Sequence, residues 1–245
     1  LYIYPSHDIP HDGEDNDNGD EYQMQDYHVF SMDSVDAPCI DHGEVLSKDD
    51  VPWVRDQMWA PDVVHKNGKY YLVFPARDKE GNFRLGIATA EKPDGPFRPE
   101  AHCIEGSFSI DPAAFMDDDG KVYVYFGGLW GGQLEKYQNG SFDPSGREPE
   151  KDKPALLPMC AVMSEDMLSF AEAPRGVQIL DEKGEPILAG DEEKRYFEDP
   201  WMHKYKGTYY LSYSTGTTHR VVYATGDNPF GPFTYRGHIL EPVIL

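Results

Sequence analysis

The chain has 245 residues, of which 39% are hydrophobic and 13% aromatic, a composition that allows a packed core and argues against global disorder. It carries 44 acidic and 22 basic residues, and its net charge of −22 argues against binding to nucleic acid phosphates or anionic lipid. No run approaches the roughly 18 apolar residues of a membrane span. Neither nucleic acid nor a membrane is therefore an expected partner.

The first and last residues both fall within strand patterns, at residues 1–4 and 239–245, so we expect a piece of a longer protein. This pattern leaves the localisation open between a secreted, a periplasmic and a cytoplasmic protein. The three cysteines are widely spaced and form no C-x-x-C pair, which predicts neither a disulfide framework nor a zinc site. We expect Cys39, Cys103 and Cys160 to be buried thiols.

Short runs rich in Tyr, Val, Phe and Ile alternate with clusters of Gly, Pro, Asn and Asp, which is typical of strands joined by tight turns. Asn67-Gly68 and Asp119-Gly120 predict hairpin turns, and Lys206-Gly207 repeats the signal more weakly. Long amphipathic helical periods are missing, and the helix candidates are short, such as the one around residues 165–170.

One unit recurs three times: an acidic residue beside a proline, followed roughly ten residues later by an aromatic-rich strand. A second repeat relates residues 86–97 to residues 222–233, since both contain Ala-Thr and end in Gly-Pro-Phe. Each module therefore has four strands, and four antiparallel strands make one propeller blade. The three acid-proline units are Trp59-Ala60-Pro61-Asp62-Val63, Ser109-Ile110-Asp111-Pro112 and Phe197-Glu198-Asp199-Pro200.

We predict an all-β propeller, with about four blades of four antiparallel strands in one domain that covers residues 1–245 and is incomplete at both ends. Residues 147–158 and 181–194 are predicted to be surface loops rather than linkers. The predicted blades cover residues 1–46 (partial), 58–103, 107–163 and 196–240, and residues 243–245 could begin a fifth.

Carboxylates at equivalent places in several blades would meet at the propeller axis, where burial and mutual repulsion raise their pKa values. Such a pair suits acid/base cleavage of a glycosidic bond. For any single motif taken alone, an Asp that caps the turn before its proline is the favoured interpretation. The three-fold register favours the functional interpretation for Asp111 and Glu198.

The chain resembles glycoside hydrolase family 43, five-bladed propeller enzymes that remove xylose or arabinose from plant cell-wall polymers. The resemblance covers essentially all 245 residues, and its motifs are Tyr4-Pro5-Ser6-His7-Asp8, Asp26-Tyr27-His28-Val29-Phe30-Ser31, Met58-Trp59-Ala60-Pro61-Asp62-Val63, Ser109-Ile110-Asp111-Pro112 and Phe197-Glu198-Asp199-Pro200. It implies a carbohydrate partner, namely xylo- or arabino-oligosaccharides derived from xylan or arabinoxylan. The choice between the two sugars, and between exo and endo action, stays open.

The resemblance implies an inverting, single-step mechanism with three carboxylates. Glu198 matches the general acid, and Asp111 matches the Asp that orients and tunes this acid. Counting back by the repeat distance from the first aromatic strand places the general base, an Asp, upstream of Leu1. The 245 residues alone are therefore expected to show little activity.

Sugar recognition needs aromatic faces and hydrogen-bonding groups around the acids. Trp59 and Trp130 are candidate platforms or core residues. Asp62 occupies the position in the second blade that is equivalent to the catalytic acids, so it either lines the channel or caps a turn. The last candidates are His7, Asp8 and Asp26, which fall in motifs that resemble the pocket edge of the family but could equally anchor turns.

Residues 12–21 hold six acids. If Gly19 is taken as the invariant glycine at position 6 of a helix-loop-helix calcium loop, the run lacks the Asp required at position 1 and the Glu required at position 12. We interpret this run as a solvated loop and assign no metal ligand. The chemistry implied requires no cofactor. Because many members of the family hold one ion in the central channel, a structural Ca²⁺ there stays open.

Two alternatives remain. A retaining five-bladed enzyme that acts on fructosides would carry an Asn-Asp-Pro-Asn motif, an Arg-Asp-Pro and a Glu-Cys, where this chain has Ile110-Asp111-Pro112 and Glu198-Asp199. A non-catalytic propeller that binds glycans would not need acids in register at the axis.

Overall fold

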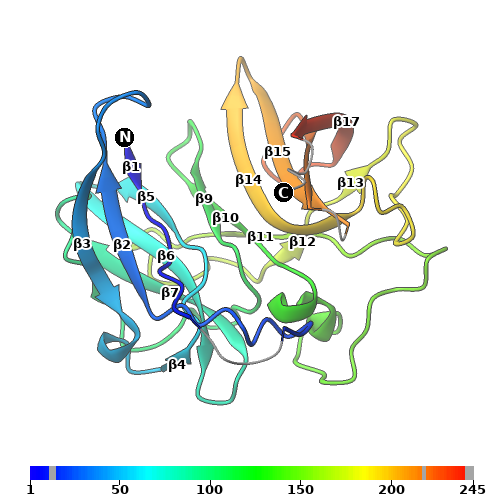
Figure 1. Ribbon diagram of the computed structural model, residues 1–245. Helices are drawn as coiled ribbons and strands as arrows, with labels where there is room; N and C mark the ends of the chain where they lie inside the picture. Colours follow the sequence, from blue (N-terminus) through cyan, green and yellow to red (C-terminus); the bar gives the residue numbers. More distant parts are fainter. Residues whose placement is uncertain (11–14, 217–218, 241–245) are drawn as a thin grey trace.

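Four sheets, antiparallel except for one edge strand of the last, follow one another in chain order in the computed structural model, which describes residues 1–10, 15–216 and 219–240 (Figure 1). The predicted all-β propeller is confirmed. Helical structure in the described residues is limited to three short 3-10 turns, η1 (Lys48–Asp50), η2 (Trp130–Gly132) and η3 (Leu134–Tyr137). None of the helices in these ranges is long and apolar enough to cross a membrane.

The first sheet contains β1 (Tyr2–Ile3), β2 (Asp26–Ser31) and β3 (Ile40–Ser47). Alternation along β2 gives its two faces different roles. Tyr27 and Val29 are fully buried on one face, whereas His28 on the other is only partly buried. The sheet corresponds to the partial first blade predicted over residues 1–46.

The second sheet contains β5 (Asp62–Lys66), β6 (Lys69–Asp78), β7 (Phe83–Ala90) and β8 (Arg98–Pro99), with β4 (Val54–Asp56) paired to the far end of β6. Asn67 and Gly68 both have positive φ, 52° and 78°, as a two-residue turn between paired Lys66 and Lys69 requires. The sheet lies within the blade predicted over residues 58–103, apart from β4.

The third sheet contains β9 (Ala113–Met116), β10 (Val122–Phe126), β11 (Met159–Val162) and β12 (Arg175–Gly176). Its predicted end at residue 163 was wrong, because β12 lies beyond it. The hairpin at Asp119-Gly120 is wider than two residues, since Met116 pairs with Val122. The helix candidate around residues 165–170 was also wrong: Met163 and Phe170 pair as an isolated bridge across a tight loop.

The fourth sheet contains β14 (Tyr196–Tyr205), β15 (Thr208–Thr215), β16 (Arg220–Gly226) and β17 (Phe233–Leu240), with β13 (Ile179–Leu180) parallel to β17 at its edge. The turn at Lys206-Gly207 joins paired Tyr205 and Thr208, as predicted. The possible fifth blade at residues 243–245 lies outside the described residues.

The two Gly-Pro-Phe repeats make equivalent structural contacts in different sheets. Phe97 and Phe233 are both buried. The backbone N–H of Phe97 donates to the Val45 carbonyl at 3.1 Å, and that of Phe233 donates to the Gln178 carbonyl at 2.8 Å. Each repeat therefore fastens the last strand of its sheet to the preceding part of the chain.

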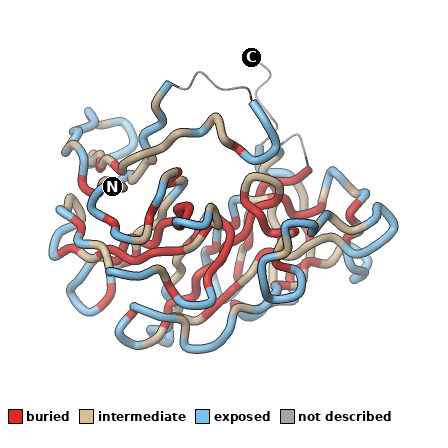
Figure 2. Tube along the Cα trace, turned by 90° about the horizontal axis from the view of Figure 1, so that it is seen from below, coloured by how far each residue is buried: buried red, intermediate tan, exposed pale blue. Residues whose placement is uncertain are grey.

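Burial concentrates on the strands, while the connections are largely exposed (Figure 2). One apolar cluster joins the first sheet to the second, and a larger one joins the second, third and fourth sheets. Strand β9 contacts both β5 and β14, so the inner strands of three sheets lie beside one another. This arrangement brings the acid-proline motifs to one region.

The two predicted surface loops lie against each other, since Pro154 and Leu188 form a bridge. The prediction of three buried thiols was wrong in part. Cys160 is buried, but Cys103 is only partly buried and Cys39 is exposed; all three are free.

Candidate active site

Two Asp-Pro turns meet between the third and fourth sheets. Asp111 precedes β9, and Asp199 lies in a bulge of β14 between the paired residues Glu198 and Trp201. Both aspartates have a φ of 55°, a left-handed conformation that Asp adopts more readily than most residues. The Asp199 N–H donates to Asp111 Oδ2 at 3.3 Å. The repeated turn therefore places two carboxyl groups side by side.

Glu198 adds a third carboxylate and pairs with a histidine. Its Oε1 lies 3.2 Å from Nδ1 of His219, which stands in the connection from β15 to β16. The hydrogen bond to Glu198 raises the pKa of His219, and the negative charges of Glu198 and Asp199 add to this effect against the cost of burial. Glu198 and His219 therefore form a pair that favours the protonated imidazole.

Burial raises the pKa of Asp111 well above its ordinary value, and the charges of Asp199 and Glu198 raise it further. The pKa of Asp199 is raised to about 6, chiefly by burial and then by the charge of Glu198, while His219 opposes the shift. Asp111 and Asp199 also share a side-chain hydrogen bond, so they titrate as a pair. The cluster therefore carries protons in a pH range where ordinary carboxyls have lost them.

A glycine-rich segment at residues 127–132 packs directly behind these turns. Ser109 Oγ donates to the Gly132 carbonyl at 2.6 Å and accepts the Gly128 N–H at 2.9 Å. A Cβ on Gly128 would lie 2.7 Å from Ile110 and 3.2 Å from the Glu198 Cβ. Glycine at this position lets the segment approach closely enough to hold both acid motifs.

A cavity of about 600 Å³ opens onto the acids. Of the residues predicted from the sequence, Asp111, Glu198, Trp59 and Trp130 line it. Its other lining residues are Ser6, Asp15, Asn16, Asp17, Gly19, Glu21, Tyr22, Met24, Ala60, Ile110, Leu129, Gly131, Gly132, Phe197, Asp199 and His219. The cavity thus combines carboxylates with aromatic surfaces.

Both tryptophans are partly buried, and protein groups satisfy their ring N–H donors. Trp59 Nε1 donates to the Tyr22 carbonyl at 3.1 Å, and Trp130 Nε1 donates to Glu148 at 2.7 Å. The Trp130 ring packs edge-on against Phe197 with centroids 5.1 Å apart. These contacts fix both indoles at the cavity wall.

Asp62 does not line the cavity. Its Oδ2 accepts the Ala114 N–H at 2.7 Å and its Oδ1 accepts the Val63 N–H at 2.8 Å, so it ties β5 to β9. Burial raises the pKa of Asp62 to about 6, against these two hydrogen bonds. Its carboxylate therefore holds two inner strands together.

The remaining predicted site residues, His7, Asp8 and Asp26, are also not among those that line the cavity, although the neighbouring Ser6 is. Asp8 is exposed. His7 Nδ1 lies 3.1 Å from Asp26 Oδ1, close to the partly buried His28. These residues form a separate cluster on the first sheet.

The sequence reasoning missed three components of the site. Asp199 could have been found by aligning the motifs on their prolines, which pairs Asp199-Pro200 with Asp111-Pro112. His219 stands in a connection that no repeat singles out. The acidic run predicted to be a solvated loop contributes Asp15, Asp17 and Glu21 to the cavity wall, although its residues 12–14 lie outside the described ranges.

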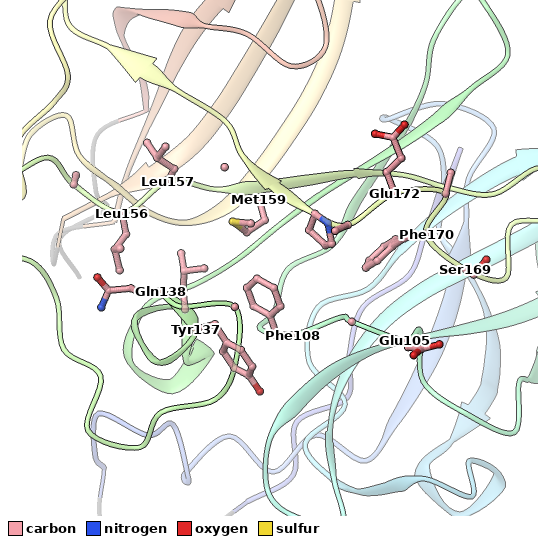
Figure 3. A pocket seen from close by; sticks show the side chains of 18 residues that line it. Glu105, Phe108, Tyr137, Gln138, Leu156, Leu157, Met159, Ser169, Phe170 and Glu172 are labelled. Atoms are coloured by element: carbon pink, nitrogen blue, oxygen red, sulfur yellow. The ribbon is translucent and has the colours of Figure 1, made fainter.

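A larger cavity, of about 960 Å³, lies beside the third sheet (Figure 3). Phe108, Tyr137, Met159 and Phe170 are among its lining residues, and the Phe108 and Tyr137 rings stack with centroids 4.6 Å apart. None of the acids of the Asp-Pro turns lines it. The acid cluster therefore singles out the smaller cavity as the candidate active site.

The pocket acids do not make a calcium cage among the described residues. Ca²⁺ takes about six to eight oxygen ligands. Within the described ranges, the group of His, Cys, Asp and Glu residues whose ligand atoms lie within 4.8 Å of one another is His7, Asp26 and His28, and it contains two nitrogen donors.

Residues 40–241 match the family model of Glycosyl hydrolases family 43. The chain belongs to this family. It is 57% identical to a xylosidase/arabinosidase of Bacteroides ovatus, over the whole chain and 75% of that protein. It is 58% identical to the xylosidase/arabinosidase 43A of Humicola insolens, over the whole chain and 77% of that protein.

Solved structures show the same fold. CoXyl43, a β-xylosidase/α-arabinofuranosidase from a compost microbial metagenome, was solved with xylotriose in a calcium-free form; it is 58% identical with a TM-score of 0.96, over 99% of this chain and 75% of that one. A family 43 enzyme of Xanthomonas citri, solved with xylotriose, is 50% identical with a TM-score of 0.92. The match covers 99% of this chain and 71% of that one. Together with the four sheets, this coverage fits an incomplete five-bladed propeller.

Proposed function

We propose that the chain forms the larger part of an inverting xylosidase/arabinosidase that releases terminal xylose or arabinose from xylan- or arabinoxylan-derived oligosaccharides. The observation that carries the proposal is the convergence of Glu198, Asp111 and Asp199 at one cavity with indole rings in its wall. The relatives named as xylosidase/arabinosidase and the complexes with xylotriose support this choice of substrate.

Glu198 is the proposed general acid. Because His219 contacts Oε1, Oε2 would carry the proton and donate it to the leaving-group oxygen. Asp111 orients and tunes this acid from the neighbouring turn. The proton that Asp111 shares with Asp199 removes one negative charge beside Glu198, and so limits the repulsion when Glu198 gives up its own proton.

The proposed general base is an Asp outside these 245 residues, in the quarter of the relatives' length that the chain does not span. It would activate a water on the opposite face of the sugar from Glu198. A single displacement of this kind inverts the anomeric carbon and needs carboxyl groups about 6.5–9.5 Å apart.

Trp59 and Trp130 are proposed to bind the apolar faces of the sugar rings. Their edges and ring N–H groups are already engaged by Tyr22, Phe197 and Glu148, so the rings are held in place before a substrate arrives. Such preorganisation lowers the entropic cost of binding. The acids at residues 15–21 would supply hydrogen-bond acceptors for sugar hydroxyls at the rim.

The decisive test is Glu198→Gln in the protein at the length of its relatives, assayed on 4-nitrophenyl xyloside, 4-nitrophenyl arabinofuranoside and xylotriose. We expect hydrolysis of the aryl glycosides to fall at least about 100-fold with the fold intact. Xylotriose should lose more, because its sugar leaving group needs protonation more than nitrophenolate does.

Glu172→Gln is the matched control, since it removes an acid from the larger cavity and should leave turnover unchanged. Unchanged turnover in Glu198→Gln would instead favour a non-catalytic glycan-binding propeller. The 245-residue chain alone should turn over substrate poorly, and robust activity in it would place the base within these residues.

A further inference from the structure

The exposed face of the first sheet carries a compact group of metal-ligating atoms that the proposed hydrolysis does not use. Its members, His7, Asp26 and His28, have one ligand atom each, and these atoms all lie within 4.8 Å of one another. His7 Nδ1 is 3.1 Å and His28 Nε2 is 3.7 Å from the same oxygen, Asp26 Oδ1. A tetrahedral ion with bonds of about 2.0–2.1 Å has ligands about 3.3 Å apart, so these separations approach what one ion requires.

Backbone pairing holds the three residues in place. Asp26 and His28 are two residues apart on β2 and therefore project from the same face. The His7 N–H donates to the Asp26 carbonyl at 3.0 Å, and Ser6 and Tyr27 form a bridge. The residues thus occupy neighbouring positions of a ladder whose opposite face, through Tyr27 and Val29, is anchored in the core. Binding an ion would need only small side-chain rotations.

A further carboxylate stands behind one of the histidines. Asp41 Oδ1, on β3, lies 3.5 Å from His28 Nδ1, the ring nitrogen that faces away from Asp26. Metal-binding histidines commonly pair their second nitrogen with a carboxylate, which fixes the ring tautomer and strengthens the ligand. This contact would leave Nε2 of His28 free of a proton and directed at the cluster.

We propose that His7, Asp26 and His28 form a binding site for a divalent transition-metal ion such as Zn²⁺. Two imidazole nitrogens and one carboxylate oxygen suit zinc and its neighbours in the first transition series. Ca²⁺ and Mg²⁺ prefer oxygen ligands alone and should bind poorly. The remaining coordination positions are open to water, since His7 is about half exposed.

The test is calorimetric titration of the untagged chain with ZnCl₂ and, separately, with CaCl₂. We expect one Zn²⁺ per chain and no Ca²⁺ binding at this site. His28→Gln and Asp26→Asn should each weaken Zn²⁺ binding at least about 10-fold, because each removes a ligand. His102→Gln, which removes an exposed imidazole elsewhere, should bind Zn²⁺ as tightly as the wild type.

His7→Gln provides a second variant that should fold normally, since His7 is exposed, and it should also weaken binding at least about 10-fold. Co²⁺ substitution gives an independent readout, because visible absorption bands should be present in the wild type and lost in His7→Gln. Absence of Zn²⁺ binding, or binding that all three ligand variants retain, would overturn the proposal. Neither readout depends on glycosidase activity.

Discussion

Asp62 and Asp111 both stand beside a proline ahead of an aromatic strand in neighbouring sheets, yet their carboxylates have different surroundings. Asp62 follows its proline, lies within β5 and accepts two backbone N–H groups. Asp111 precedes its proline, takes a left-handed turn and meets the carboxyl group of Asp199. Similar acid-proline motifs therefore give an Asp that links two strands in one sheet and an Asp that lines the cavity in the next.

Ionising these buried carboxyl groups near neutral pH has a cost in folding stability. The raised pKa values of Asp111 and Asp199 mean that both groups favour folding below about pH 4. For Asp199 this contribution is lost as the pH rises through about 6, and for Asp111 it is lost as the pH rises through its own raised pKa. Asp62 shows the same direction, but its two hydrogen bonds offset part of the penalty. Asp111 and Asp199 offset it through their contact with each other and, for Asp199, through the charge of His219, and perturbed carboxyl groups of this kind are typical of functional sites.

The largest expected difference between the two positions is in catalysis. Asp111→Asn should lower turnover of xylotriose at least about 100-fold in the protein at the length of its relatives, because the carboxyl group proposed to orient and tune Glu198 is lost. Asp62→Asn makes the same chemical change in the acid-proline motif of the second sheet and should lower turnover less than about 10-fold. Equal losses of turnover in steady-state assays of the two variants would contradict the different roles assigned to Asp62 and Asp111.

The expected effect on stability is smaller, and it should be greater at Asp62 than at Asp111. Asp62→Ala leaves the Ala114 N–H without its acceptor and should lower the free energy of unfolding by about 1–3 kcal/mol in urea titrations. Asp111→Asn should be neutral or stabilising at pH 7.5, since it removes a carboxyl group whose ionisation is disfavoured by burial and by the charges of Asp199 and Glu198. A greater loss in Asp111→Asn than in Asp62→Ala would contradict these assignments.

Local signals predicted much of the fold. Asn67-Gly68, Lys206-Gly207 and the Gly-Pro-Phe repeats report backbone geometry that neighbouring residues determine, so the hairpins and the repeat positions were correct. Strands β12 and β13 are two residues long and depend on pairing with distant chain, which no local pattern encodes. The exposed Cys39 shows the same limit, because burial of a single side chain depends on the whole fold.

The site was predictable where motifs repeat. The convergence of Asp111 and Glu198 followed from register, whereas the partner of Asp111 became visible only when Asp199 was seen to adopt the same turn. The link that Asp62 makes between two strands depends on the Ala114 N–H, 52 residues away. Contacts between residues so far apart in the sequence decide which carboxyl groups face the cavity, and no local sequence pattern predicts them.

The proposed site requires the carboxyl groups of Asp111, Glu198 and Asp199 to lie close enough for their charges to interact. Carboxyl ¹³C NMR titration of the wild type and of Glu198→Gln tests this requirement most directly. The wild type should show the Asp199 carboxyl titrating at about pH 6, and Glu198→Gln should lower this midpoint, because removal of the Glu198 charge eases ionisation of its neighbour. A midpoint that stays unchanged in Glu198→Gln, or an Asp199 that titrates near its ordinary value in the wild type, would contradict the shared site.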